Sequence, residues 1–270
     1  MGLFDIFKKG SKAKEEKVHV LPSFILLDEA ELDIDLFVKN FYEDWGVQIP
    51  PDDDDSEKED DDLPMIVATI DNMMVAVSLI PAPVPNGEAV ENAKTNFRWP
   101  DAVAVTESHK AHILVAILPG GEPSLKKIAT LHTKLCATCL RQPHAVAINT
   151  AGTVFAPDFY IETAKSLIEK DSFPIMNHVF FGIYSNDNGK TFSGYTYGLG
   201  DLGKQDIEIL NSTHDANEIF EFMADIALYV MESNAVLRHG ETLGSTAEEK
   251  LKITESAGVA LDGKTLKIEY

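Results

Sequence analysis

Apolar residues recur along this chain with two periods, one typical of strands and one typical of helices. Short apolar runs rich in β-branched and aromatic residues predict strands, and apolar residues spaced three or four apart predict amphipathic helices. The predicted strands fall at residues 22–30, 65–72, 73–83, 109–121, 144–155, 178–187, 191–200 and 206–210. The predicted helices fall at residues 33–46, 86–97, 122–142, 157–170 and 216–233.

Three turn signals separate these elements. Asp71-Asn72 divides two short apolar strands and Asn188-Gly189 divides two aromatic runs, and each pair predicts a tight β-hairpin. The segment HGETLG at residues 239–244 is either a glycine loop that holds a ligand or a plain turn. Because glycine readily adopts positive φ, we expect a turn between the last long helix and the terminal strand.

This order of elements predicts an α+β protein of two closely packed ferredoxin-like halves, with mainly antiparallel sheets and helices on one face. We place a flexible N-terminal tail at residues 1–18, the first half at 19–155 and the second half at 156–270. The two halves share no residue-level repeat that would indicate duplication. A chain of 270 residues is long enough to bury a large core.

The net charge narrows the range of partners, because 44 acidic residues against 23 basic ones give a formal charge of −21. Nucleic acids and anionic membranes bind surfaces with a surplus of Lys and Arg, so we expect no nucleic-acid partner and no stable membrane association. A basic protein is the natural complement of an acidic surface.

Two segments differ in composition from the rest of the chain. The acidic loop at residues 51–64 contains nine carboxylates and one lysine, and it lacks the spacing and the glycine of an EF-hand. Since dense like charges repel, we predict a solvated linker there. The first 17 residues join an apolar patch to five lysines. This pattern suits a weak amphipathic membrane anchor or a tail ahead of the fold, and we predict the tail.

The cellular compartment is predicted from the lack of a signal peptide and of a membrane-spanning segment in the sequence. The N-terminal segment has no apolar signal-peptide region, and no apolar run reaches the roughly 20 residues that a membrane-spanning helix needs. We therefore predict a cytoplasmic protein.

The sharpest cluster of reactive side chains is His132, Cys136, Cys139 and His144. On a helix the first three lie on one face, where zinc would find two thiolates and an imidazole. The same face carries the apolar core residues, and cysteine is itself among the most buried residue types. A redox cysteine normally lies at a helix N-terminus, whereas two turns precede this pair. We predict buried structural cysteines and no cofactor, with zinc binding as the alternative.

The glycines of FSGYTYGLG, at residues 192–200, have the outline of a phosphate-binding loop. They alternate with tyrosines along a predicted strand, and the Gly-Lys-Ser/Thr of a P-loop is missing. We expect these glycines to permit strong twist or close backbone approach.

Several segments together resemble a known family. HGETLG at 239–244 and EEKLKI at 248–253, with WPDA at 99–102 and GYTYGLGDLGKQDIEIL at 194–210, are similar to an uncharacterised bacterial domain-of-unknown-function family, the one numbered four-two-six-one. The resemblance covers residues 60–270 and is most specific at the C-terminal motifs. Members occur beside polymorphic toxins and their antidotes. The resemblance therefore implies a bacterial cytoplasmic protein with an immunity or interaction role and no assigned activity.

The acidic charge and the lack of a catalytic set of residues predict a non-enzymatic interaction protein that binds a basic protein partner. The alternative is a small-ligand binder or enzyme that uses a polar pocket between the two halves. The pocket would be formed by Trp99, His112, Tyr195, Thr196, Glu241 and Thr242. The sequence leaves the oligomeric state open.

Overall fold

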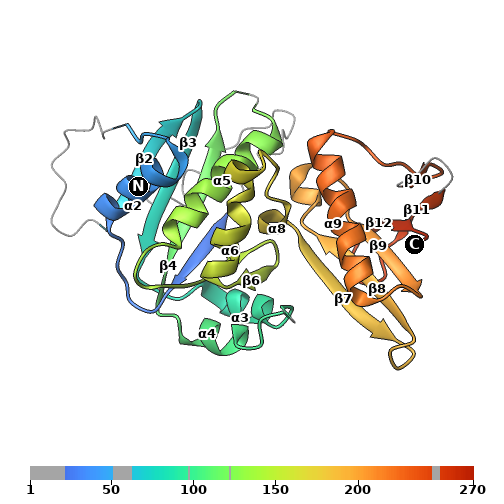
Figure 1. The fold of residues 1–270 in the computed structure, drawn as a ribbon. Coiled ribbons are helices and arrows are strands. Elements are labelled where there is room, and N and C mark those ends of the chain that lie inside the picture. The colour runs from blue at the N-terminus through green and yellow to red at the C-terminus, as the bar shows by residue number, and fades with distance from the viewer. Residues whose placement is uncertain (1–21, 51–62, 97, 122, 245–249) are drawn as a thin grey trace, which may run out of the picture.

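The computed structural model describes residues 22–50, 63–96, 98–121, 123–244 and 250–270. These residues form two six-stranded sheets that lie side by side, each with helices packed on it (Figure 1). The sheets are mainly antiparallel, so the predicted α+β class with two sheet-containing halves is confirmed. The predicted N-terminal tail and most of the acidic loop lie outside the described residues.

The first sheet has the strand order β2-β3-β4-β1-β5-β6, and each neighbouring pair is antiparallel. Its strands are β1 (Ser23–Leu27), β2 (Met65–Ile70), β3 (Met73–Ile80), β4 (Ala111–Pro119), β5 (Ala145–Thr150) and β6 (Thr153–Phe155). Both β4 and β5 pair with β1, so β4, helix α5 (Leu125–Cys139) and β5 form a β-α-β unit that β1 splits. Such a split unit is the element that ferredoxin-like folds contain.

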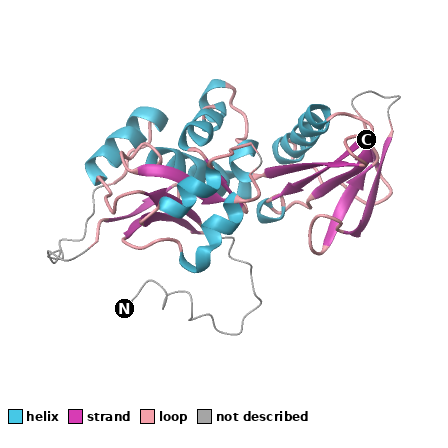
Figure 2. Cartoon of the chain, turned by 90° about the horizontal axis from the view of Figure 1, so that it is seen from below, coloured by secondary structure: helices cyan, strands magenta, loops and turns pink. Residues whose placement is uncertain are grey.

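Helices lie on both sides of the first sheet (Figure 2). Helices α2 (Ile34–Trp45), α5 and α6 (Pro157–Ala164) enclose the main core on one face, which β1 enters through Ile25 and Leu27. Helices α3 (Glu88–Ala93) and α4 (Ala102–Ser108) pack on the opposite face near β5 and β6, where β1 presents Leu26. The sequence does not predict α4 as a helix, because the segment is rich in β-branched residues. In the structure this helix packs through the buried residues Ala102 and Thr106.

The second sheet has the strand order β10-β11-β12-β9-β8-β7, with β12 parallel to β9. Its strands are β7 (Phe180–Asn186), β8 (Thr191–Tyr197), β9 (Ile207–Ser212), β10 (Thr242–Leu243), β11 (Leu251–Ala257) and β12 (Lys264–Ile268). Helix α9 (Ala216–Glu232) connects β9 to the β10–β12 region and packs on β7 and β8. It begins at a capping box, in which the Asp215 carboxylate accepts from the Glu218 amide and the Glu218 carboxylate accepts from the Asp215 amide.

Gly194 on β8 allows α9 to approach the sheet closely. A Cβ at this position would lie 2.7 Å from Met223 Cε and 2.8 Å from Ile219 Cγ2. The expectation that the FSGYTYGLG glycines serve close backbone approach is therefore confirmed at Gly194.

The chain passes from the first core to the second after α6. Tyr160 and Ala164 of α6 belong to the first core, whereas Phe173 and Ile175 belong to the second. The short helices α7 (Ser166–Glu169) and α8 (Ile175–His178) connect the two. The predicted division after residue 155 thus falls earlier in the chain than the change of core, because the apolar side of α6 packs back onto α5 and β5.

The predicted turns are present. Asp71 and Asn72 have φ of 50° and 63° between the paired strands β2 and β3, and Asn188 and Gly189 have positive φ between β7 and β8. Gly240 has φ of 86°, and its amide donates to the Ile253 carbonyl at 2.9 Å. The HGETLG segment is therefore a turn that leads into the edge strand β10.

A buried ion pair joins the two parallel strands. The Glu208 carboxylate is fully buried, lies 2.7 Å from Lys267 Nζ, and accepts from the amides of Val259 and Ala260 and from the Thr265 hydroxyl. Burial by itself raises the pKa of Glu208, but the hydrogen bonds from Lys267 and the two amides outweigh it and leave the pKa lowered. The carboxylate also ties the loop between β11 and β12 to the sheet.

Replacement of Glu208 by alanine will leave Lys267 nearly buried and unpaired, so we expect it to destabilise the fold by about 3 kcal/mol in urea unfolding. Because the pKa is lowered in the folded state, this contribution is present above the ordinary glutamate pKa and is lost as pH falls through the lowered value. Glu255→Ala, which breaks the exposed pair with Lys264, is the control and should change stability far less. Equal effects of the two variants would contradict the assigned role.

Candidate functional site

The predicted zinc or redox cluster is a buried part of the first core. Cys136 and Cys139 on α5 are free thiols with no exposed surface. Burial raises the pKa of Cys136 to about 12 and the pKa of Cys139 well above its usual value. His132 Nε2 lies 3.5 Å from the Cys136 sulfur. Since the thiolate is the form that attacks or binds a metal, burial of these protonated thiols favours a packing role.

His144 lies apart from this cluster, on the surface after α5. Its Nδ1 is 3.0 Å from Asp28, and its Nε2 is 3.5 Å from Glu31 and 3.8 Å from Glu29. Within the described ranges, Glu29, Glu31 and His144 are the group whose ligand atoms come within 4.8 Å of one another. Both glutamates are largely exposed, so this arrangement is an ordinary surface cluster of charges. The four predicted zinc ligands do not form one set.

We expect Cys136 and Cys139 to resist a water-soluble disulfide reagent in the native protein, because their sulfurs are buried and protonated. After unfolding in guanidinium chloride, both should react at the rate of an ordinary thiol. Absorbance of the released thiolate measures both rates. Rapid modification of either cysteine in the native protein would show that the α5 cluster is accessible.

The six side chains of the predicted polar pocket do not converge. His112 is buried beside Phe24 in the first half, and its Nδ1 contacts the Ala82 carbonyl at 2.7 Å. Thr196 is buried in the second half, where its hydroxyl donates to Asp206 and accepts from the Ile207 amide. Both are satisfied structural residues.

The remaining members lie at separate places. Tyr195 lies on β8, with its ring over Gly182, whereas Glu241 and Thr242 lie at the β10 edge, four strands away. Four strand spacings correspond to about 19 Å. Glu241 instead accepts from the Arg238 amide. The prediction of this pocket is therefore wrong, because its members lie in separate parts of the fold: His112 bonds within the first half, Thr196 within the second half, and Glu241 at the β10 turn. Trp99 alone lines a cavity between the two halves.

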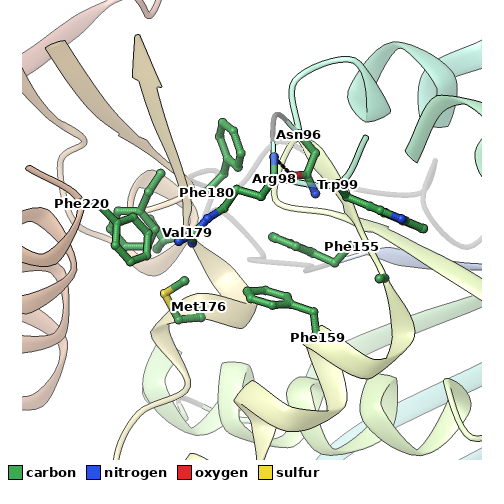
Figure 3. A pocket seen from close by; sticks show the side chains of 11 residues that line it. Asn96, Arg98, Trp99, Phe155, Phe159, Met176, Val179, Phe180 and Phe220 are labelled. Carbon is green, nitrogen blue, oxygen red and sulfur yellow. Dashed lines mark hydrogen bonds between the residues drawn. The ribbon is translucent and has the colours of Figure 1, made fainter. Parts of the chain in front are cut away.

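That cavity is lined mainly by aromatic side chains from both halves and has a volume of about 160 Å³ (Figure 3). Phe155 and Phe159 come from β6 and α6, and Phe180 and Phe220 come from β7 and α9. Sequence reasoning missed these residues, because they come from four separate elements and share no local pattern. The cavity is apolar, which differs from the polar pocket that the sequence suggested.

Arg98 is the charged residue of the cavity lining. It lies in the loop between α3 and α4, and its guanidinium carbon lies 4.2 Å from the centre of the Phe220 ring in the other half. Asn96 fixes the start of this loop, since its amide nitrogen donates to the Val154 carbonyl and its oxygen accepts from the Arg98 amide. The loop thus holds Arg98 against the second half.

A second feature is β2, which is the edge strand of the first sheet among the described residues. The Leu79 amide donates to the Pro64 carbonyl, so the pairs two residues further along, Ile66 with Val77 and Ala68 with Val75, are the hydrogen-bonded ones. The intervening residues of β2 therefore direct their main-chain N–H and C=O groups away from β3. These residues are Met65, Val67 and Thr69.

Apolar side chains accompany this open edge. Met65, Val67 and Met74 are 44%, 45% and 43% exposed, although protein surfaces usually carry such residues singly. They share one face of the β2–β3 hairpin, because Val67 faces Ala76 and Thr69 faces Met74 in register. Helices α3 and α4 cover this face only near β5 and β6. The β2 end of the face is open.

Comparison with known proteins adds a family over the last part of the chain. Residues 195–269 match the family model described as Domain of unknown function (DUF4261). The resemblance read from the sequence is confirmed over this range, which runs from β8 to β12 and includes α9. No curated protein and no solved structure matches this chain. The cavity lining and the β2 edge lie mostly outside the matched DUF4261 range.

None of the helices in the described residues combines sufficient length with sufficient apolar character to cross a bilayer.

Proposed function

We propose that this protein is a bacterial cytoplasmic interaction protein that binds a basic polypeptide partner at the β2 edge, in the manner of an immunity protein. The observation that supports the proposal is the edge of β2, where main-chain groups that none of the described residues pairs lie beside exposed apolar side chains. A partner strand that added to β2 would satisfy these main-chain groups and cover the side chains of Met65 and Val67.

The charge around β2 favours a basic partner. From Glu59 to Ala93 the sequence contains seven acidic residues and no Lys or Arg. In the sequence, Asp62 precedes Met65, the first residue of β2, by three positions. Attraction between this region and a basic segment increases the association rate and weakens with salt.

The same charge disfavours a second copy of this chain as the occupant. Two copies that met at β2 would bring together two acidic regions within molecules of formal charge −21. Edge strands in natural proteins are commonly protected by a lysine or by an inward-pointing charge. Strand β2 has the sequence MIVATI and carries neither, so its edge is available to a partner.

Replacement of Val67 by lysine will place a cation in the proposed interface, and we expect it to weaken binding of a basic strand at least about tenfold. The probe is an eight-residue peptide of alternating valine and lysine, titrated by calorimetry at low and high salt. Val259→Lys is the matched control, since Val259 is 65% exposed and lies in the second half. We expect the control to bind like the parent protein.

Amide hydrogen exchange tests where the peptide binds. Saturating peptide should slow exchange at Met65, Val67 and Thr69 and leave the outward amides of β10 unchanged. A peptide that binds without protecting β2, or that tolerates Val67→Lys, would contradict the proposed edge. Failure of affinity capture from the native host to recover any protein would count against the interaction function itself.

A further inference from the structure

We infer that the cavity between the two halves is a binding site for a small aromatic monocarboxylate. Aromatic residues make up more than half of its lining, and its volume of about 160 Å³ is similar to that of an apolar cavity that holds one benzene ring. Protein interiors are usually packed without such spaces, so an aromatic-lined cavity of this size suits a ligand that fills it. The size and the aromatic lining of the cavity therefore suit a ligand with a single aromatic ring.

Arg98 specifies the charge of the ligand. The chain has three arginines, and two of them have carboxylate partners, Arg141 with Asp44 at 2.5 Å and Arg238 with Glu241 at 3.4 Å. Arg98 instead stacks on Phe220, and none of the described carboxylates pairs with its guanidinium. In a protein with such an excess of acid, a guanidinium without a carboxylate at a cavity is unusual. It offers a specific place for an anion.

The stacked geometry leaves the bonding groups of Arg98 available. Its guanidinium carbon lies over the Phe220 ring, and none of the described acceptor groups bonds to its side-chain N–H groups, so they are available to an anion. A carboxylate accepts two such N–H groups side by side. A ligand with its ring among Phe155, Phe159 and Phe180 would place a carboxylate at Arg98, whose side chain extends into the same cavity (Figure 3).

A more highly charged ligand fits less well. The lining supplies one cation, and its other side chains are apolar apart from Asn96, which is already bonded to Val154 and Arg98. A second negative charge placed among the aromatic rings, away from the exposed Arg98, would lie without a partner. The site therefore selects a single carboxylate over a phosphate ester or a dicarboxylate.

Phenylacetate is the test probe, and Trp99 is the reporter. The chain has two tryptophans, so Trp45→Phe leaves Trp99 in the cavity wall as the source of tryptophan fluorescence. We expect a saturable change with a dissociation constant on the order of 1 mM or tighter. The neutral isostere phenylacetamide should bind about tenfold more weakly, because it lacks the charge that Arg98 recognises.

Two variants separate the charge from the cavity. Arg98→Gln should weaken phenylacetate about tenfold and remove the difference between acid and amide, whereas Arg141→Gln should leave both unchanged. Ala156→Leu fills the cavity without altering Arg98 and should abolish binding of both compounds in a protein with unchanged circular dichroism.

Three results would overturn the inference: no saturable signal from phenylacetate, equal binding of acid and amide, or binding that survives Ala156→Leu. A peptide with an aromatic C-terminal residue is included as a further probe. If it binds in an Ala156-dependent way while phenylacetate does not, the cavity holds a partner's side chain, and the small-molecule assignment is wrong.

Discussion

The buried contact between α5 and α8 sets how the two sheets lie relative to each other. Thr133 and His178 meet at 2.7 Å, and the rings of His178 and His132 lie 5.6 Å apart. Asn177 of α8 donates to the Tyr160 carbonyl of α6 at 2.9 Å. Burial lowers the pKa of His178 to about 4, so this contact is between neutral groups at physiological pH. The aromatic cavity exists because this junction holds β7 and α9 opposite β6 and α6.

The two exposed features of the molecule have opposite electrostatic settings. Strand β2 lies in a stretch of sequence, residues 59–93, that contains no Lys or Arg, whereas the cavity presents a guanidinium that no described carboxylate neutralises. At each of these two sites the local charge has one sign: negative in the sequence around β2 and positive at Arg98. The first attracts a cationic chain to a surface, and the second attracts an anionic group to an apolar interior.

The sequence predicted most of the elements, since their apolar periods and turns are local properties. The amphipathic pattern of α5 and the Asp71-Asn72 turn specify their structures within a few residues. The sequence could not predict α4, because its β-branched residues favour a strand. In the fold this segment is a helix that buries Ala102 and Thr106. The candidate site depends on which distant segments meet. Arg98, next to the predicted site residue Trp99, could not be selected from the sequence, because its place at the cavity follows from contact with Phe220, which is 122 positions later in the chain.

The parallel pair β9–β12 has a consequence for the order in which the protein folds. Glu208 and Thr265 bond across a separation of 57 residues, whereas β7 and β8 close through a short turn. Long-range pairing carries a larger loop-closure entropy and forms more slowly than a hairpin. We therefore expect the β7–β8–β9 meander to form first. In that intermediate β9 is an exposed edge strand. Docking of β12 then completes the sheet, so the last kinetic step of the second half is also the one that buries its ion pair.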